Sequence, residues 1–248
     1  MYKASLTTIF LSAALPAAAQ ETAPAAPAPA MPPAANPATP APTLSQEQIV
    51  AFNKAVTDFT AGQQAQQKGD NATALAKYEA ALPAIRDAVK IQPGKIDNVN
   101  FLANALYAAA AANAALQKLD AVAPLYEESL PYWRQVVQAK PADAQSRGVL
   151  TGILIQTANF KLGKQDKAGA APLYAEAVPL ARKAVAEQAN AVNRNLLLAA
   201  LIGASQTSED AALKAEASTM SKAMIADGTV DAANKPSAQV LAQSAKAG

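Results

Sequence analysis

The sequence predicts an all-α protein, a right-handed solenoid of about four antiparallel helical hairpins preceded by a disordered linker of proline and alanine. Three segments of the chain resemble one another at a constant spacing of 48 residues. Alanine, the best helix former, is abundant, whereas aromatic residues make up only 5% of the chain. A fixed period of about 20–50 residues is typical of stacked repeats, because a single unit cannot bury its apolar face alone.

The three similar segments begin at Tyr78, Tyr126 and Tyr174 and share four columns of residues. These columns are Tyr78/Tyr126/Tyr174, Leu82/Leu130/Val178, Pro83/Pro131/Pro179 and Arg86/Arg134/Arg182. The prolines lie inside an otherwise helical pattern. They predict either a bend in each helix or a break that restarts with proline as a first helical residue.

Residues 1–19 resemble an export signal. Lys3 precedes a short apolar run at residues 4–15, and Ala17 and Ala19 are the small residues of a signal-peptidase site, so we expect cleavage after Ala19. The alternative is a retained anchor, but the run is shorter than the roughly 20 residues that a membrane-spanning helix needs. We therefore expect a periplasmic or secreted protein with no membrane insertion after cleavage.

Residues 20–43 are expected to form the disordered linker. Proline at almost every second or third position denies this segment a helical hydrogen-bond ladder and favours an extended chain. We expect a tether, with a ligand for a proline-binding partner as the alternative. The helical repeat domain follows at residues 44–228, and a tail at residues 229–248 is expected to hold a short helix from Ser237.

The repeat domain divides into four units, at about residues 45–93, 97–141, 142–189 and 190–228. Ser45 and Gln48 form a capping box at its start, and Gly69 ends the first helix before Asp70 caps the second. The fourth unit has lost the tyrosine, proline and arginine of its second helix, as is typical of the end of a solenoid. The N-caps expected for later helices are Asp97, Asp120, Asp143, Asp166 and Ser208.

Residues 62–82 resemble a tetratricopeptide repeat (TPR). Small Gly62, the turn at Gly69 and aromatic Tyr78 fall where that motif places its small residue, turn and aromatic residue, and Ala74, Ala81 and Leu82 also match. Asp58 and Ala65 stand where the motif has aromatic residues, and the period of 48 exceeds the usual period of about 34. The resemblance implies a superhelix whose first helices line a concave groove that binds a protein or peptide segment.

Composition excludes several kinds of active site. The chain has no histidine and no cysteine, which removes His-based triads, Cys–His dyads and Cys/His zinc sites. It also lacks a glycine-rich phosphate loop and an Asp-x-Asp calcium loop. A net charge of +2 without a basic patch gives no support for nucleic-acid binding. We therefore expect no enzyme, no cofactor and no metal.

The column Arg86, Arg134 and Arg182 is one candidate binding feature. In a stacked array it would form a basic ladder that holds the carboxylates of a partner peptide. The alternative is structural: each guanidinium lies over the next helix and pairs with an acid or a free carbonyl. We favour the structural alternative, because this position shares a helix face with core residues.

A second column lies on the first helices, at a spacing of 47 residues. The resemblance places it in the groove, where related domains grip peptide backbones or C-terminal carboxylates with Asn, Lys and Arg. With Asn104, one turn beyond Asn100, the candidate peptide-binding residues are Asn53, Asn100, Asn104, Arg147 and Arg194. The alternative is a polar exposed edge of amphipathic helices.

The expected function is that of an exported scaffold or adaptor, which binds a protein or peptide segment in cell-envelope assembly or transport. Tyr107, Tyr132 and Trp133 are expected to fill the core, with an aromatic hot spot in the groove as the alternative. One rival function is a receptor for a small molecule or glycan. Another is a carboxylate-based glycan-cleaving enzyme, which would need two acids that converge from different repeats.

Overall fold

The computed structural model describes residues 42–244. Over this range the chain forms α-helices and no strands, which confirms the predicted all-α solenoid. The predicted signal segment, residues 20–41 of the linker and the last four residues lie outside the described residues. The nine helices of the described range are α1 Gln46–Gln67, α2 Asn71–Ile91, α3 Ile96–Ala115, α4 Leu119–Ala139, α5 Ala144–Gly163, α6 Lys167–Glu187, α7 Ala191–Thr207, α8 Ala211–Ala226 and α9 Lys235–Ser244.

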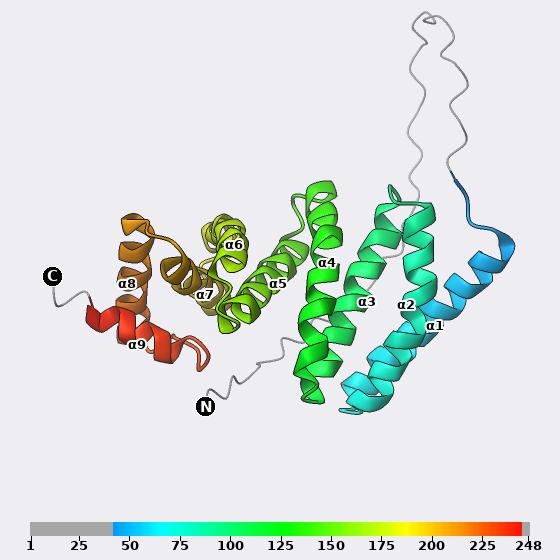
Figure 1. The fold of residues 1–248 in the computed structure, drawn as a ribbon, viewed down its shortest axis with the longest axis horizontal. Coiled ribbons are helices and arrows are strands. Elements are labelled where there is room, and N and C mark those ends of the chain that lie inside the picture. The colour runs from blue at the N-terminus through cyan, green and yellow to red at the C-terminus, as the bar shows by residue number, and fades with distance from the viewer. Residues whose placement is uncertain (1–41, 245–248) are drawn as a thin grey trace, which may run out of the picture.

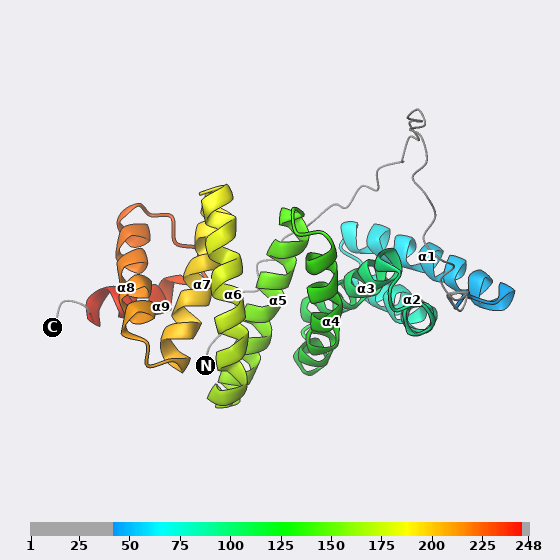
Figure 2. The same ribbon diagram turned by 90° about the horizontal axis from the view of Figure 1, so that it is seen from above.

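Each helix packs against the next one in the chain, so α1 and α9 lie at opposite ends of an elongated array (Figure 1). Helices α2 and α4 run along the plane of this view, whereas α6 and α7 are seen nearly end-on. The view from above reverses this relation (Figure 2). The helix axes therefore change direction along the array.

The helices form two layers. Phe101 of α3 contacts Phe52 and Phe59 of α1 through edge-on ring pairs, at centroid distances of 5.6 and 5.1 Å, and α5 contacts α7. These contacts join α1 to α3 and α5 to α7, and we call the odd-numbered helices α1, α3, α5 and α7 the odd layer. The even-numbered helices α2, α4, α6 and α8 form the even layer, which is linked by ion pairs described below.

The turn between the two helices of a hairpin has the same backbone conformation in the first three units. Gly69, Gln117 and Gln165 all adopt positive φ angles, of 80°, 58° and 64°. The following amide in each turn reaches back to the carbonyl five residues earlier, as in Asp70 N to Ala65 O at 2.9 Å. This geometry pairs backbone carbonyls in the last turn of the first helix, and it holds even where glutamine replaces the favoured glycine.

The helix starts agree only in part with the expected N-caps. The capping box of Ser45 and Gln48 is present, and the carboxylates of Asp70, Asp143 and Asp166 accept from backbone amides of the helix that follows. The prediction was wrong for Asp97 and Asp120, which lie in the first turns of α3 and α4, where an acid still favours the helix dipole. It was also wrong for Ser208, which ends α7, while Asp210 caps α8.

The prolines lie within continuous helices. Pro83, Pro131 and Pro179 are exposed residues inside α2, α4 and α6, so the helices do not break there. Pro124 and Pro172 form a further exposed pair at the same spacing of 48. Because each proline ring faces solvent, the helix hydrogen bond that proline cannot donate is missing on the solvent-facing side of the helix rather than in the core.

The repeated tyrosines occupy equivalent core positions. Tyr78, Tyr126 and Tyr174 are each at most 5% exposed and sit between an odd and an even helix. Tyr78 contacts the ring of Phe59, and its hydroxyl donates to Gln66 at 2.8 Å. The hydroxyl of Tyr174 donates to Asn159 of α5. Each ring therefore fills the space that small residues leave between two helices.

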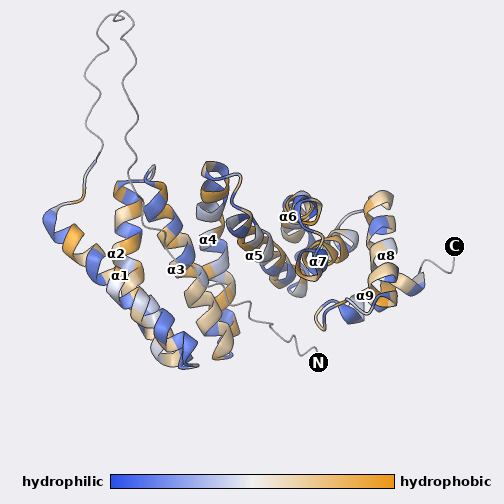
Figure 3. Cartoon of the chain, turned by 180° about the vertical axis from the view of Figure 1, so that it is seen from behind, coloured by the Kyte–Doolittle hydropathy of each residue, from blue (hydrophilic) through white to orange (hydrophobic). Residues whose placement is uncertain are grey.

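The two ends of the array are finished differently. At the start, Val56 of α1 is 43% exposed, whereas the residues at the same position in α3, α5 and α7 (Ala103, Leu150 and Leu197) are buried. No helix of the described range covers this side of α1, and hydrophobic residues are visible near its start (Figure 3). At the other end, α9 packs against α8, and its Ala238 is buried in a small cluster with Leu198, Ile202 and Met224.

Along residues 42–244, no helix combines the length and the apolar character that crossing a bilayer requires.

Candidate functional site

The arginine ladder is present, but its guanidinium groups are engaged within the chain. Arg86 of α2 makes a two-pronged ion pair with Glu128 of α4, with nitrogen–oxygen distances of 2.7 and 2.8 Å. Arg134 of α4 makes the same contact with Glu176 of α6, at 2.8 and 2.7 Å. Arg182 pairs in turn with Glu216 of α8. This pattern matches the structural alternative, since each arginine links two successive hairpins.

The ladder has a defined start and end. Glutamates 128 and 176 are 48 residues apart, and the equivalent position in the first unit is Ala80. At the last unit Lys222 follows Glu216 by six residues, as Arg134 follows Glu128 and Arg182 follows Glu176. Lys222 is exposed and forms no ion pair within the described residues. The middle units therefore carry both halves of the pair, the first unit only the cation.

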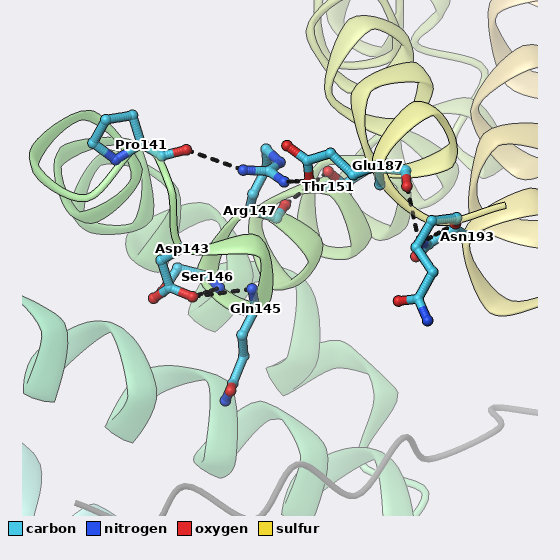
Figure 4. Close-up of polar contacts among 10 residues, drawn as sticks. Pro141, Asp143, Gln145, Ser146, Arg147, Thr151, Glu187 and Asn193 are labelled. Atoms are coloured by element: carbon cyan, nitrogen blue, oxygen red, sulfur yellow. Dashed lines mark hydrogen bonds and ion pairs between the residues drawn. The ribbon is translucent and has the colours of Figure 1, made fainter. Parts of the chain in front are cut away.

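Arg147 of the second column is buried and structural. Its residue is 2% exposed, and its guanidinium donates to the carbonyl of Pro141 at 3.0 Å and pairs with Glu187 at the end of α6 (Figure 4). Thr151 donates to the backbone carbonyl of Arg147 at 2.8 Å. The side chain thus fastens the start of α5 to the end of α6 and the loop before α5, and it is not presented to a ligand.

Arg194 occupies the same position in the next unit and acts in a similar way. Its guanidinium pairs with Asp227, at the end of α8, at 3.3 Å, and remains partly exposed. Asn53, at the first position of the column, is exposed on α1; its backbone carbonyl accepts from Thr57, and its side-chain amide has no partner within the described residues. The structure therefore does not bring the four column residues together as one ligand clamp.

Asn100 and Asn104 of α3 are bonded to each other and still keep unpaired polar atoms. The side-chain nitrogen of Asn104 donates to the backbone carbonyl of Asn100 at 2.8 Å and to its side-chain oxygen at 3.1 Å. Within the described residues, Asn100 Nδ2 and Asn104 Oδ1 then have no partner. Both residues are half-buried. They offer one donor and one acceptor on adjacent turns, as the backbone of an extended peptide requires.

The neighbouring odd helix, α5, presents an open strip to solvent. Gly148 and Gly152 lie one turn apart, and a methyl group added at either would meet no other atom within 4 Å. Gln156 and Asn159 continue the strip toward the end of α5. A backbone could therefore approach α5 closely here. We call Asn100, Asn104, Gly148, Gly152 and Gln156 the carboxamide face.

A pocket of about 230 Å³ lies beyond this face, where α5, α6, α7 and the start of α9 meet. Its hydrogen-bonding side chains are those of Asn159, Tyr174, Gln206, Asn234 and Ser237. Burial raises the pKa of Tyr174 to about 12, so this hydroxyl stays neutral at physiological pH. Among residues 42–244, no other ionisable side chain lines the pocket, so its described lining is polar but uncharged.

The aromatic candidates of the second unit have separate environments. Trp133 is 2% exposed and belongs to the core, and Tyr132 is half-buried against it. Tyr107 stacks on Tyr126 with ring centroids 6.1 Å apart, so the pair fills the space between α3 and α4. These positions favour the predicted core role over a hot spot.

Sequence reasoning missed three features. The glutamate column could have been found, because Glu128 and Glu176 repeat at the same spacing as the arginines. Asn195, which anchors the tail, and Asp58, which is buried and pairs with Lys54 and Lys77, have no repeated signal. Across residues 42–244, no three acidic side chains gather where they could hold a metal ion.

The comparisons with known proteins add no relative. No protein-family model matches this chain, and no curated protein matches it in sequence.

Proposed function

We propose that this protein is an exported, TPR-like scaffold that binds an extended peptide segment of another protein along its odd layer. The observation that carries the proposal is the unpaired donor and acceptor of Asn100 and Asn104, which are half-buried and lie one turn apart on α3. Paired carboxamides of this kind suit a peptide bond, because it offers one carbonyl and one amide.

The engagement of the column arginines in ion pairs supports backbone recognition. Both arginine columns are used in ion pairs within the chain, so a partner would not be selected mainly by its acids. The open glycines of α5 support the same proposal, since a peptide backbone can approach closely where no Cβ stands in the way. In a TPR-like superhelix this layer lines the concave groove.

We further propose the periplasm or the extracellular space as the location, after removal of residues 1–19, and a role in envelope assembly or transport. The signal-like N-terminus and the proline-rich segment support this proposal, because a tether of this composition would separate the helical array from its point of export. We propose no catalytic activity, since carboxylates on the described helices are mostly used in ion pairs.

The test is selection of ligands from a library of displayed random peptides by the purified protein. Selected peptides are expected to bind the variant Asn100→Ala/Asn104→Ala at least tenfold more weakly, because two hydrogen bonds are lost at about 1 kcal/mol or more each. The matched control is Glu79→Ala, an exposed change on the even layer, which should leave affinity unchanged.

Two results would contradict the proposal. One is a library that yields no enriched sequence. The other is a set of selected peptides that bind the double variant as well as the unchanged protein. A receptor for a free glycan remains the rival, and the pocket at the start of α9 is the feature that favours it. Glycan-array binding without peptide binding would select that rival.

A further inference from the structure

The pocket at the junction of α5, α7 and α9 is a built feature rather than a gap between repeats. One wall consists of Ala233, Asn234 and Ser237, from the segment that leads into α9. Asn195 of α7 holds this segment: its side-chain nitrogen donates to the carbonyl of Thr229 at 2.8 Å, and its side-chain oxygen accepts from the amide of Asp231 at 2.8 Å. The wall is therefore fixed to α7 by side-chain hydrogen bonds.

Asn234 is positioned by the same network. The side chain of Asn234 is fixed in orientation, because its Nδ2 donates to the backbone carbonyl of Asn195 at 3.0 Å. The backbone amide of Asn234 also donates to the side chain of Asp231, at 2.8 Å. The residue is 9% exposed, yet its side-chain oxygen has no partner within the described residues. A fixed, unpaired acceptor therefore lines the pocket.

The opposite wall supplies the donor. Asn159 of α5 accepts the hydroxyl proton of Tyr174, which fixes its side-chain oxygen toward the ring and leaves Nδ2 as an unpaired donor. The hydroxyl of Ser237 and the carboxamide of Gln206 are likewise without partners in the described range. Gly203 forms part of the wall beside the ring of Tyr174.

We infer that this pocket receives an uncharged carboxamide side chain, that of glutamine or asparagine, from the bound peptide. A primary amide needs an acceptor for its NH₂ and a donor for its carbonyl, and Asn234 and Asn159 offer these two groups. The volume of about 230 Å³ is smaller than the roughly 300 Å³ at which pockets for drug-sized ligands begin, so one side chain fits better than a large ligand. This inference rests on the proposed function, because it names the side chain that the bound peptide would supply.

The uncharged lining predicts discrimination against the isosteric acid. Glutamate has the shape of glutamine, but its carboxylate would lose water without gaining a cation, and the acceptor of Asn234 would face a negative oxygen. The pocket is therefore expected to prefer glutamine to glutamate by tenfold or more, on the order of the penalty for an unpaired buried polar group.

The test uses single capped amino acids and the full-length protein. N-acetyl-glutamine methylamide is added during ¹⁵N NMR of the side-chain amides, with N-acetyl-glutamate methylamide and N-acetyl-alanine methylamide as matched probes. We expect saturable shifts at the amides of Asn159, Gln206 and Asn234, with a dissociation constant on the order of 1 mM, as for a ligand of this size.

Two variants localise the binding. Gln206→Ala removes an exposed, unpaired carboxamide and should weaken binding about fivefold, while Gln145→Ala, an exposed carboxamide at the start of α5 outside both the pocket and the carboxamide face, should leave it unchanged. Ala199→Leu should fill the pocket and abolish binding, with circular dichroism to check that the variant is folded.

Each other outcome overturns the inference. If the glutamine probe causes no shifts, the pocket does not bind a carboxamide side chain. Equal binding of the glutamate probe would refute the preference for an uncharged side chain. Preference for N-acetylglucosamine, whose amide could enter the same space, would assign the pocket to a free sugar instead. These probes carry one residue and do not span the carboxamide face, so their failure is separate from the failure of the library test above.

Discussion

Gly203→Ala is the substitution whose effect the packing predicts most sharply. A Cβ at this position would lie 2.0 Å from Cε1 and 2.2 Å from Cζ of Tyr174. The ring cannot move away easily, because it is 0% exposed and its hydroxyl is bonded to Asn159. Overpacking of this kind costs about 1–3 kcal/mol. Alanine returns up to about 1 kcal/mol of helix propensity, which leaves a net loss of up to about 2 kcal/mol.

The matched control is Gly152→Ala on α5. It gives the same gain in helix propensity, but the new methyl group meets nothing within 4 Å, so this variant should be more stable by up to about 1 kcal/mol. Gly62→Ala, whose Cβ would lie 2.6 Å from Cε1 of Tyr78, should fall between the two.

Urea unfolding followed by circular dichroism measures the order of these three variants. Because a repeat array can unfold in parts, hydrogen exchange of α7 should accompany the global measurement. A Gly203→Ala protein as stable as the unchanged protein would refute the reasoning. So would equal shifts for Gly203→Ala and Gly152→Ala, since the two changes would then not depend on the tyrosine.

Three further predictions concern charge and pH. Arg147→Ala should lower the free energy of unfolding by about 2 kcal/mol, because the buried guanidinium loses its hydrogen bond to Pro141 and its ion pair with Glu187. Urea unfolding measures this, and a loss below that of Arg194→Ala would contradict it. Arg134→Ala should lower the free energy of unfolding by only about 0.5–1 kcal/mol, because its ion pair with Glu176 is half exposed, and this loss should shrink in high salt. Lys222, which is exposed and has no ion pair within the described residues, is the control, and Lys222→Ala should leave the stability unchanged. Burial raises the pKa of Tyr78 and Tyr174 from 10.0 to about 12. The neutral hydroxyls therefore stabilise the fold below pH 10, and this stability is lost as the pH rises from 10 to about 12. Unfolding followed by tyrosinate absorbance should show that the stability of the Tyr→Phe variants falls less steeply with pH over this range.

The fold was predictable because its defining contacts recur. A tyrosine opposite a small residue marks the place where two helices meet, and this mark repeats every 48 residues from Tyr78 to Tyr174. The left-handed turn was predictable from Gly69 but not from Gln117 or Gln165, which adopt a conformation that glutamine does not favour. In those two units the packing of the hairpin decides the turn, not the local residue.

The candidate site was predictable only in part. Asn100 and Asn104 were identified from their place on a first helix, and their side chains do retain unpaired atoms. The fate of Arg147 was not predictable, because its partner Glu187 has no equivalent in the first two units. The pocket depends on the tail after α8, which departs from the repeat pattern, so no periodic signal could have placed Asn159 beside Asn234.

The ladder of Arg86, Arg134 and Arg182 distinguishes the first, middle and last units of the array by the halves of the ion pairs that they carry. In a middle unit, a glutamate pairs with the arginine of the unit before it, and an arginine pairs with the glutamate of the unit after it. The first unit has Ala80 in place of the glutamate, so it could not pair with an arginine of a unit placed before it. An additional middle unit inserted between α4 and α5 would thus find both of its neighbours already equipped to receive it. Lengthening before α1 has no such provision, so growth of this protein by duplication is favoured from the inside of the array.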